Sequence, residues 1–244
     1  MKKLGFGLMR LPVTKKDDPT KIDMKQLGKM ADVFVGNGFT YFDTAYMYHD
    51  GISEKAVKKA IVARYPRESF LLATKLPTMF LKEEGDQERI FAEQLEKCGV
   101  DYFDYYLLHN LNVENYAIAE KFGSFAYVAK LKKEGKIRHM GFSFHDTAEV
   151  LDKILTEHPE AEFVQLQINY LDWDDPTIQS RKCYETAVRH GKKVIVMEPV
   201  KGGTLANLPE EAAKLLKEAH PDWTQAGWAL RFVAGLENLS LIHI

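Results

Sequence analysis

Short apolar runs alternate with amphipathic segments through most of the chain. Apolar runs predict strands at residues 40–43, 70–75, 103–109, 137–143, 163–168, 194–197 and 239–244. Helical spacing of apolar residues predicts helices at residues 24–37, 53–64, 86–98, 117–134, 147–158, 176–190, 209–219 and 224–233. This alternation of strands and helices is typical of parallel βαβ units.

Two folds are built from such units, an open doubly wound sheet and a (β/α)₈ TIM barrel. A dinucleotide-binding doubly wound domain has a glycine-rich turn between its first strand and a helix, whereas Gly5-Phe6-Gly7 precedes no predicted helix. Polar residues end many different strands, and a barrel brings all such ends to one face. The sequence of 244 residues therefore favours a single α/β barrel domain over residues 1–244.

The two ends of the chain fit this barrel less well. Residues 4–12 are predicted to form a short hairpin or lid before the first repeat. Counted from residue 40, the run at 239–244 is then the seventh strand, and the sequence ends there. We therefore expect a barrel truncated after the seventh strand, either a fragment or a product whose last few residues are foreign, which binds a cofactor poorly.

Four residues at or near three successive strand ends form the candidate catalytic group: Asp43, Tyr48, Lys75 and His109. Taken singly, each has an ordinary explanation as a turn, packing or solvated residue. Taken together, they suit the protonation of a carbonyl oxygen, because a lysine ammonium favours the phenolate of a tyrosine and a carboxylate holds the lysine. Since no side chain donates hydride, a nicotinamide cofactor is implied.

Composition and charge disfavour several other classes of protein. The net charge is −2 and there is no block of like charge, which disfavours nucleic acid as a partner. Cys98 and Cys183 are isolated, so neither disulfides nor a metal site are predicted. With neither a signal peptide nor an apolar run of membrane-spanning length, we expect a cytoplasmic protein with no membrane partner.

The sequence resembles the aldo-keto reductase superfamily over nearly its whole length. The resemblance rests on Asp43-Thr44-Ala45-x-x-Tyr48, on Ala73-Thr74-Lys75, on residues 95–109 ending in Leu107-Leu108-His109, and on Gly141-Phe142-Ser143. It implies a reductase of aldehydes and ketones that uses NADPH or NADH. In such an enzyme Tyr48 is the general acid, Lys75 lowers the pKa of Tyr48, Asp43 holds Lys75 and His109 positions the carbonyl.

The resemblance also implies a cofactor surface. Ser143 and Gln165 are expected to bind the nicotinamide carboxamide, although Phe144 replaces the usual asparagine. Glu198 stands where the family usually has an aromatic residue that stacks on the nicotinamide. The remaining expected cofactor residues are Met9, Arg10, Pro199, Val200, Lys201, Gly202 and Gly203, of which the glycine pair suits a pyrophosphate.

Several motifs, including Met197-Glu198-Pro199, resemble one branch of the superfamily. That branch often carries a C-terminal iron–sulfur domain, but the cysteines of this chain do not support a cluster. Two alternatives to an active enzyme remain, a non-catalytic regulatory barrel that binds the cofactor and an inactive truncated fragment. The identity of the carbonyl substrate, the choice between NADP and NAD, and the oligomeric state are open.

Overall fold

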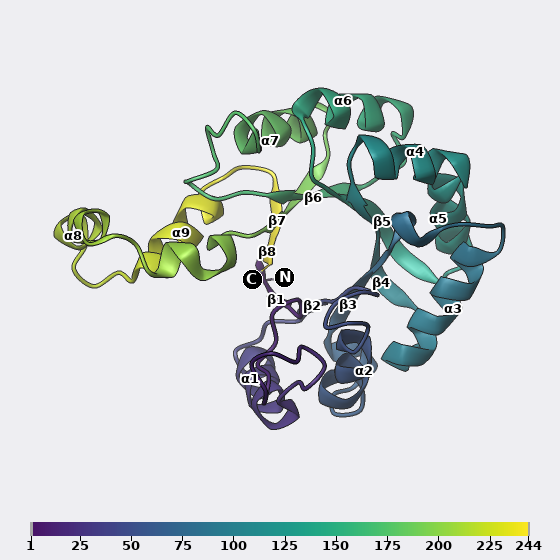
Figure 1. Ribbon diagram of the computed structural model, residues 1–244, viewed down its shortest axis with the longest axis horizontal. Helices are drawn as coiled ribbons and strands as arrows, with labels where there is room; N and C mark the ends of the chain where they lie inside the picture. The colour runs from purple at the N-terminus through teal and green to yellow at the C-terminus, as the bar shows by residue number, and fades with distance from the viewer. Residues whose placement is uncertain (1, 244) are drawn as a thin grey trace.

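The computed structural model describes residues 2–243, and it shows a closed ring of parallel strands surrounded by helices (Figure 1). The strands pair in sequence order, and the last pairs with the first. Their bounds are β1 Leu4–Gly7, β2 Tyr41–Asp43, β3 Leu71–Leu76, β4 Phe103–Leu111, β5 Ile137–Phe144, β6 Phe163–Gln167, β7 Lys193–Met197 and β8 Leu239–His243. The prediction of a TIM barrel is confirmed.

The prediction that the barrel is truncated after its seventh strand is wrong. Residues 4–7 are not part of a hairpin or lid but form β1, which pairs with β2 through Gly5 and Tyr41. The run expected as the seventh strand is β8, which pairs with β1 through Ile242 and Leu4. Because this short strand, which contains Gly5 and Gly7, is the first of the ring, every later strand stands one place further along than expected. Ile244, the last residue of the expected strand, lies outside the described residues.

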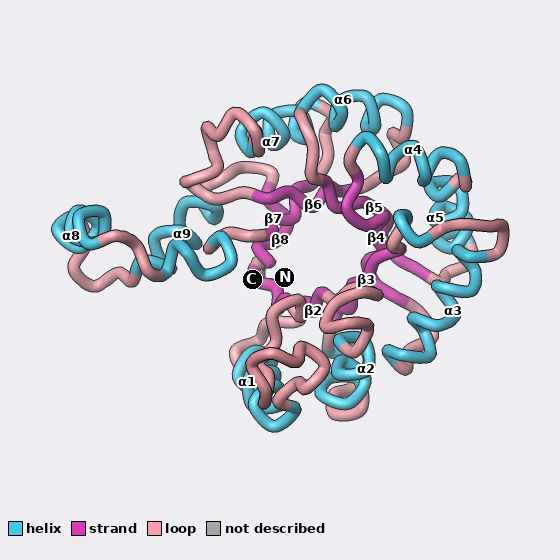
Figure 2. The backbone as a smooth tube through the Cα atoms, in the orientation of Figure 1, coloured by secondary structure: helices cyan, strands magenta, loops and turns pink. Residues whose placement is uncertain are grey.

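Helices cover the outside of the ring, as Figure 2 shows in cyan around the magenta strands. Their bounds are α1 Met24–Gly36, α2 Ser53–Val57, α3 Asp86–Cys98, α4 Val113–Lys121, α5 Ser124–Lys133, α6 Ala148–Glu157, α7 Ser180–Arg189, α8 Glu210–Ala219 and α9 Gln225–Ala234. The helix predicted at 117–134 is two helices, because Gly123 takes a left-handed conformation (φ 61°) between α4 and α5. The helix predicted at 53–64 is α2 followed by a π-helical turn over 58–62.

The core has two layers on the two sides of the strands. Most apolar side chains lie between strands and helices, for example Phe42, Leu72 and Leu108. Alternate residues point into the barrel, where Tyr41, Ala73, Leu107, Phe163, Ile195 and Leu241 form an apolar floor. Within residues 2–243, no helix is both long and apolar enough to cross a membrane.

Candidate active site

A layer of polar side chains lies directly above the apolar floor, and it follows from the two-residue period of the strands. Each side chain of the layer belongs to the residue two positions after an inward-facing residue of the same strand, so it points to the same side but lies nearer the C-terminal end of the strand. The layer contains Asp43, Lys75, His109, Ser143, Gln165 and His243, all at most 8% exposed. The strands therefore bring three of the four predicted catalytic residues into one layer of the barrel.

Asp43 and Lys75 form a buried ion pair at the centre of this layer. The Lys75 ammonium donates hydrogen bonds to Asp43 Oδ1 and to the carbonyl oxygen of Thr44, the latter at 2.7 Å. Burial works against both charges, but each stabilises the other. The pKa of Asp43 consequently lies below its usual value, and the pKa of Lys75 lies above its usual value. Lys75 is therefore a fixed, permanently charged ammonium at neutral pH.

Tyr48, from the loop between β2 and α2, completes the predicted group. Its ring centroid lies 4.9 Å from Lys75 Nζ and 5.8 Å from the ring centroid of His109. Burial raises the pKa of Tyr48, and the Lys75 ammonium opposes that rise without cancelling it. The expected direction of the Lys75 effect is present, but the net pKa of Tyr48 lies above its usual value, so Tyr48 holds its proton at neutral pH.

His109 is a neutral imidazole on β4. Burial and the nearby Lys75 ammonium lower its pKa to about 3. Its Nδ1 atom is buried and has no hydrogen-bond partner among the described residues. A neutral imidazole carries one N–H, and an N–H already bonded to another protein group could not be donated to a ligand. The His109 ring beside Tyr48 can therefore donate its N–H to an oxygen atom of a ligand.

Gln165 and Ser143 form the wall of the site on β6 and β5. Gln165 Nε2 lies 3.4 Å from Asp43 Oδ2 and 3.3 Å from His243 Nδ1, whereas its Oε1 is buried without a partner among the described residues. Ser143 Oγ accepts a hydrogen bond from the backbone N–H of Asn110 at 2.8 Å. This leaves the Ser143 hydroxyl proton free to be donated, so both side chains retain hydrogen-bonding capacity toward the cavity.

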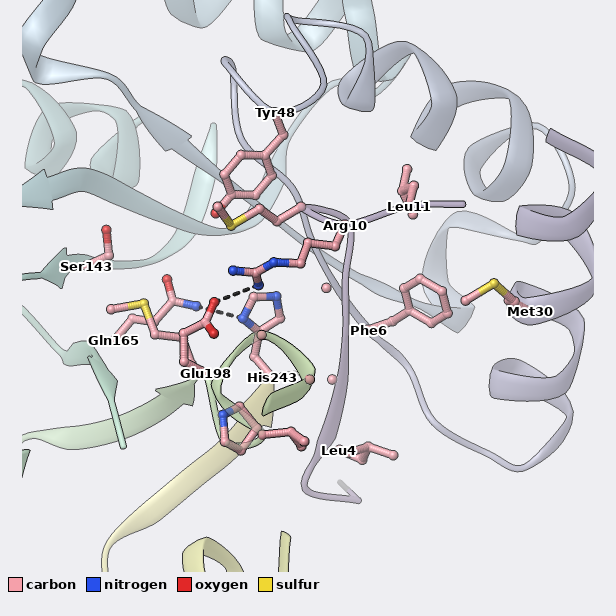
Figure 3. Close-up of a pocket in the computed structure, with 18 of the residues that line it drawn as sticks. Leu4, Phe6, Arg10, Leu11, Met30, Tyr48, Ser143, Gln165, Glu198 and His243 are labelled. Carbon is pink, nitrogen blue, oxygen red and sulfur yellow. Dashed lines mark hydrogen bonds and ion pairs between the residues drawn. The ribbon is translucent and has the colours of Figure 1, made fainter. Parts of the chain in front are cut away.

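A cavity of about 1250 Å³ opens above this layer and extends between the loops after β1 and β7. Its lining includes Met9, Arg10, Tyr48, Lys75, His109, Ser143, Gln165, Glu198, Pro199, Val200, Gly202 and Gly203. Figure 3 shows Tyr48, Arg10, Glu198 and Gln165 around it. Asp43 does not line the cavity itself but pairs with Lys75, which does. The predicted residues thus surround one space, with the exceptions of Asp43 and Lys201.

Lys201 holds the loop after β7 instead of lining the cavity. Its ammonium pairs with Asp172, which is buried and also accepts hydrogen bonds from Gln167 Nε2 at 2.8 Å and Asn169 Nδ2 at 2.7 Å. Lys201 itself has a positive φ of 47°, and so do Gly202 and Gly203 at 62° and 98°. The ion pair therefore anchors a tight left-handed turn that approaches the cavity.

Sequence reasoning missed several residues of the site. The Thr44 carbonyl oxygen is the second partner of Lys75, and His49 fixes the loop after β1 by accepting a hydrogen bond from the Leu11 N–H at 2.9 Å. Asn110 lines the cavity because an irregular register near the end of β4 and a positive φ of 58° disturb the alternation there. His243 was missed because β8 was not assigned to a complete ring; its place two residues after Leu241 is the signal that could have found it.

Comparison with known proteins places the chain in a family. The model of the aldo/keto reductase family matches residues 3–241, so the chain belongs to that family. An aldo-keto reductase from Strobilurus tenacellus is 31% identical over 184 residues, which cover 72% of this chain and 51% of the relative. A methylglyoxal reductase from Escherichia coli is 36% identical over 115 residues, covering 46% of this chain and 37% of the relative. The chain thus spans about half the length, or less, of these curated relatives.

Solved structures of the family share the fold. The holo form of an aldo-keto reductase from Bacillus halodurans has a TM-score of 0.73 and 25% identity, covering 99% of this chain and 82% of that chain. An aldo-keto reductase from Klebsiella pneumoniae in complex with NADPH has a TM-score of 0.72 and 21% identity, covering 99% of this chain and 80% of that chain. Both comparisons extend over almost the whole barrel described above.

Proposed function

We propose that this barrel reduces aldehyde or ketone carbonyls with a nicotinamide cofactor, NADPH or NADH. The observation that carries the proposal is the Lys75 ammonium, buried against Asp43 and facing the ring of Tyr48. A buried ammonium beside a protonated phenol has a clear use in proton donation, because it stabilises the phenolate as that forms. Membership of the aldo/keto reductase family supports the same reaction.

The residues of the cavity fit a nicotinamide. The unpartnered Gln165 Oε1 and the donatable hydroxyl of Ser143 are complementary to the N–H and C=O groups of a carboxamide. The left-handed turn at Gly202 and Gly203 suits close approach of backbone N–H groups to a pyrophosphate. Met9, Arg10, Glu198, Pro199 and Val200 would contact the cofactor from the two loops.

Each of the four side chains then has a separate role in protonating the carbonyl oxygen. The Tyr48 hydroxyl donates its proton to the carbonyl oxygen, and the Lys75 ammonium stabilises the resulting phenolate. Asp43 keeps Lys75 charged and in place, and the neutral His109 ring donates an N–H to the same carbonyl oxygen and so orients it. A nicotinamide held by Ser143 and Gln165 would supply the hydride for the carbonyl carbon.

Small aldehydes and dicarbonyls are the first substrates to test, since two relatives from Escherichia coli are named methylglyoxal reductases. Two buried free cysteines, Cys98 and Cys183, support a reducing cytoplasm as the compartment. Neither the cofactor preference nor the natural substrate follows from the cavity alone, so the test uses both cofactors and a panel of carbonyl compounds.

The experiment follows the loss of absorbance of NADPH or NADH with methylglyoxal and other aldehydes and ketones. The unaltered protein should turn over, and Tyr48→Phe should lower kcat by about 10²–10⁴-fold, the usual contribution of a general acid. Cofactor affinity, measured by fluorescence titration, should stay within about threefold of the unaltered protein, because Phe keeps the ring. Turnover that is equal in the two proteins would refute the role of Tyr48. Cofactor binding without any turnover would favour a regulatory barrel.

A further inference from the structure

An ion pair crosses the cavity between the loops after β1 and β7. Arg10 Nη1 lies 2.6 Å from Glu198 Oε1, and the two residues are 188 positions apart in the sequence. Figure 3 shows this pair beside Tyr48 and Gln165, in the part of the cavity where the proposed chemistry takes place. A pair of charged side chains is unexpected in a site that would bind a flat aromatic ring. The function of this pair therefore needs an explanation.

Glu198 is the fixed partner of this pair, and Arg10 is the movable one. The Glu198 side chain is 20% exposed, against 58% for Arg10. The Glu198 backbone has a positive φ of 56°, and its carbonyl oxygen accepts hydrogen bonds from Asn169 Nδ2 at 3.1 Å and from the Lys201 N–H at 3.0 Å. The backbone of Glu198 is therefore held in place, and its less exposed side chain stays at the cavity when Arg10 moves.

Glu198 also faces two imidazoles, those of His145 after β5 and His243 on β8. Burial lowers the pKa of both rings, which makes them neutral at neutral pH. Lys75 is already paired with Asp43. Arg10 is thus the positive charge that compensates Glu198, and any cation brought into this part of the cavity would compete with Arg10 for the carboxylate.

The proposed cofactor brings such a cation in only one of its two redox states. An oxidised nicotinamide ring carries one positive charge, whereas the reduced ring is neutral, and the rest of the molecule is the same. A ring whose carboxamide contacts Gln165 lies near Glu198, because Gln165 in β6 and Glu198, directly after the neighbouring strand β7, line the same cavity on either side of His243.

We propose that Glu198 makes the cavity favour the oxidised over the reduced nicotinamide, and that Arg10 limits this preference by competing for the carboxylate. The inference rests on the proposed function and deepens it. Stabilising the oxidised ring makes the bound reduced cofactor a stronger hydride donor. Arg10 and Glu198 would then set the driving force for carbonyl reduction without contacting the carbonyl.

The test measures dissociation constants for the oxidised and reduced forms, NADP⁺ with NADPH and NAD⁺ with NADH, by calorimetry at one pH and salt concentration. The ratio of the two constants isolates the ring charge, since phosphate and adenosine contacts cancel. Glu198→Gln should shift the ratio about tenfold toward the reduced form. Arg10→Gln should shift it in the opposite direction, because Glu198 loses its competing partner. Glu218→Gln, which removes an exposed charge on α8, should leave the ratio unchanged.

Each result bears on the inference. A purely structural role of the pair would weaken both redox forms equally, so an unchanged ratio in both variants overturns the inference and leaves the proposed function standing. Failure of the unaltered protein to bind either form overturns both. If Glu198→Gln does not fold, Arg10→Gln and a salt titration of the unaltered protein decide, since 1 M salt should weaken the preference for the oxidised form.

Discussion

Replacing Asp43 by Asn should destabilise the barrel strongly, because it leaves the Lys75 ammonium buried without its carboxylate. The two side chains are 0% and 1% exposed, so water cannot replace the lost partner. Removing one member of a buried ion pair costs about 3–5 kcal/mol. In a chain of this size about 1 kcal/mol lowers Tm by roughly 2–4 °C, so Asp43→Asn should melt about 6–20 °C lower than the unaltered protein.

Thermal unfolding followed by circular dichroism measures this loss. The double variant Asp43→Asn with Lys75→Met should recover part of the stability, because both buried charges are then gone. Lys214→Met breaks an exposed pair with Glu218 and serves as the control that should leave Tm unchanged. The reasoning is refuted if Asp43→Asn melts within about 2 °C of the unaltered protein, or if the double variant is less stable than the single one.

The pH dependence of this difference has a definite sign. Burial favours the protonated form of Asp43, but Lys75 and the hydrogen bond that it donates outweigh burial and lower the pKa of Asp43. The stability that Asp43 contributes is therefore present above about pH 4, and it is lost as pH falls through the pKa of Asp43 in the folded protein. The pKa of Lys75 is raised, so its contribution is present below about pH 10 and is lost as pH rises beyond its folded value. The gap in stability between the two proteins should therefore be widest between about pH 5 and 10.

Two further predictions concern His109 and Gly141. Burial lowers the pKa of His109 to about 3, against about 6.5 in an unfolded chain, so the free energy of unfolding should fall as pH drops below about 6.5. His109→Gln should flatten that slope in denaturant titrations, and an unchanged slope would contradict a neutral buried ring. A Cβ at Gly141 would lie 2.4 Å from the Phe163 carbonyl oxygen, so Gly141→Ala should lower the free energy of unfolding by about 1–3 kcal/mol. Gly36→Ala, where a Cβ meets no atom within 4 Å, should not.

The sequence was sufficient for most of the fold, because parallel strands and amphipathic helices have different periods. It failed at β1, where a strand of only four residues, Leu4–Gly7, contains two glycines, which are more typical of a turn than of a strand. What makes it a strand is pairing with β2 and β8, and pairing is a property of the closed ring. The break between α4 and α5 was missed for a similar reason, since the positive φ of Gly123 is visible only in the structure.

Within the site, the strand residues were easier to foresee than the loop residues. Asp43, Lys75 and His109 share a layer because each follows an inward-facing floor residue by two positions. Loops follow no such period. Lys201 was expected at the cofactor but binds Asp172, while Asn110 lines the cavity only because the register of β4 shifts. Burial, moreover, decides the net pKa of Tyr48, and burial cannot be read from the motif around it.

The central claim, that Tyr48 and Lys75 protonate a carbonyl that receives hydride in this cavity, is tested most directly by following the hydride. The protein is incubated with methylglyoxal and a nicotinamide cofactor carrying deuterium on either face of its C4 position, and the alcohol is analysed by mass spectrometry. We predict deuterium on the former carbonyl carbon from one face only, and little or none with Tyr48→Phe, which still binds the cofactor. Transfer at the same rate in Tyr48→Phe would contradict the claim.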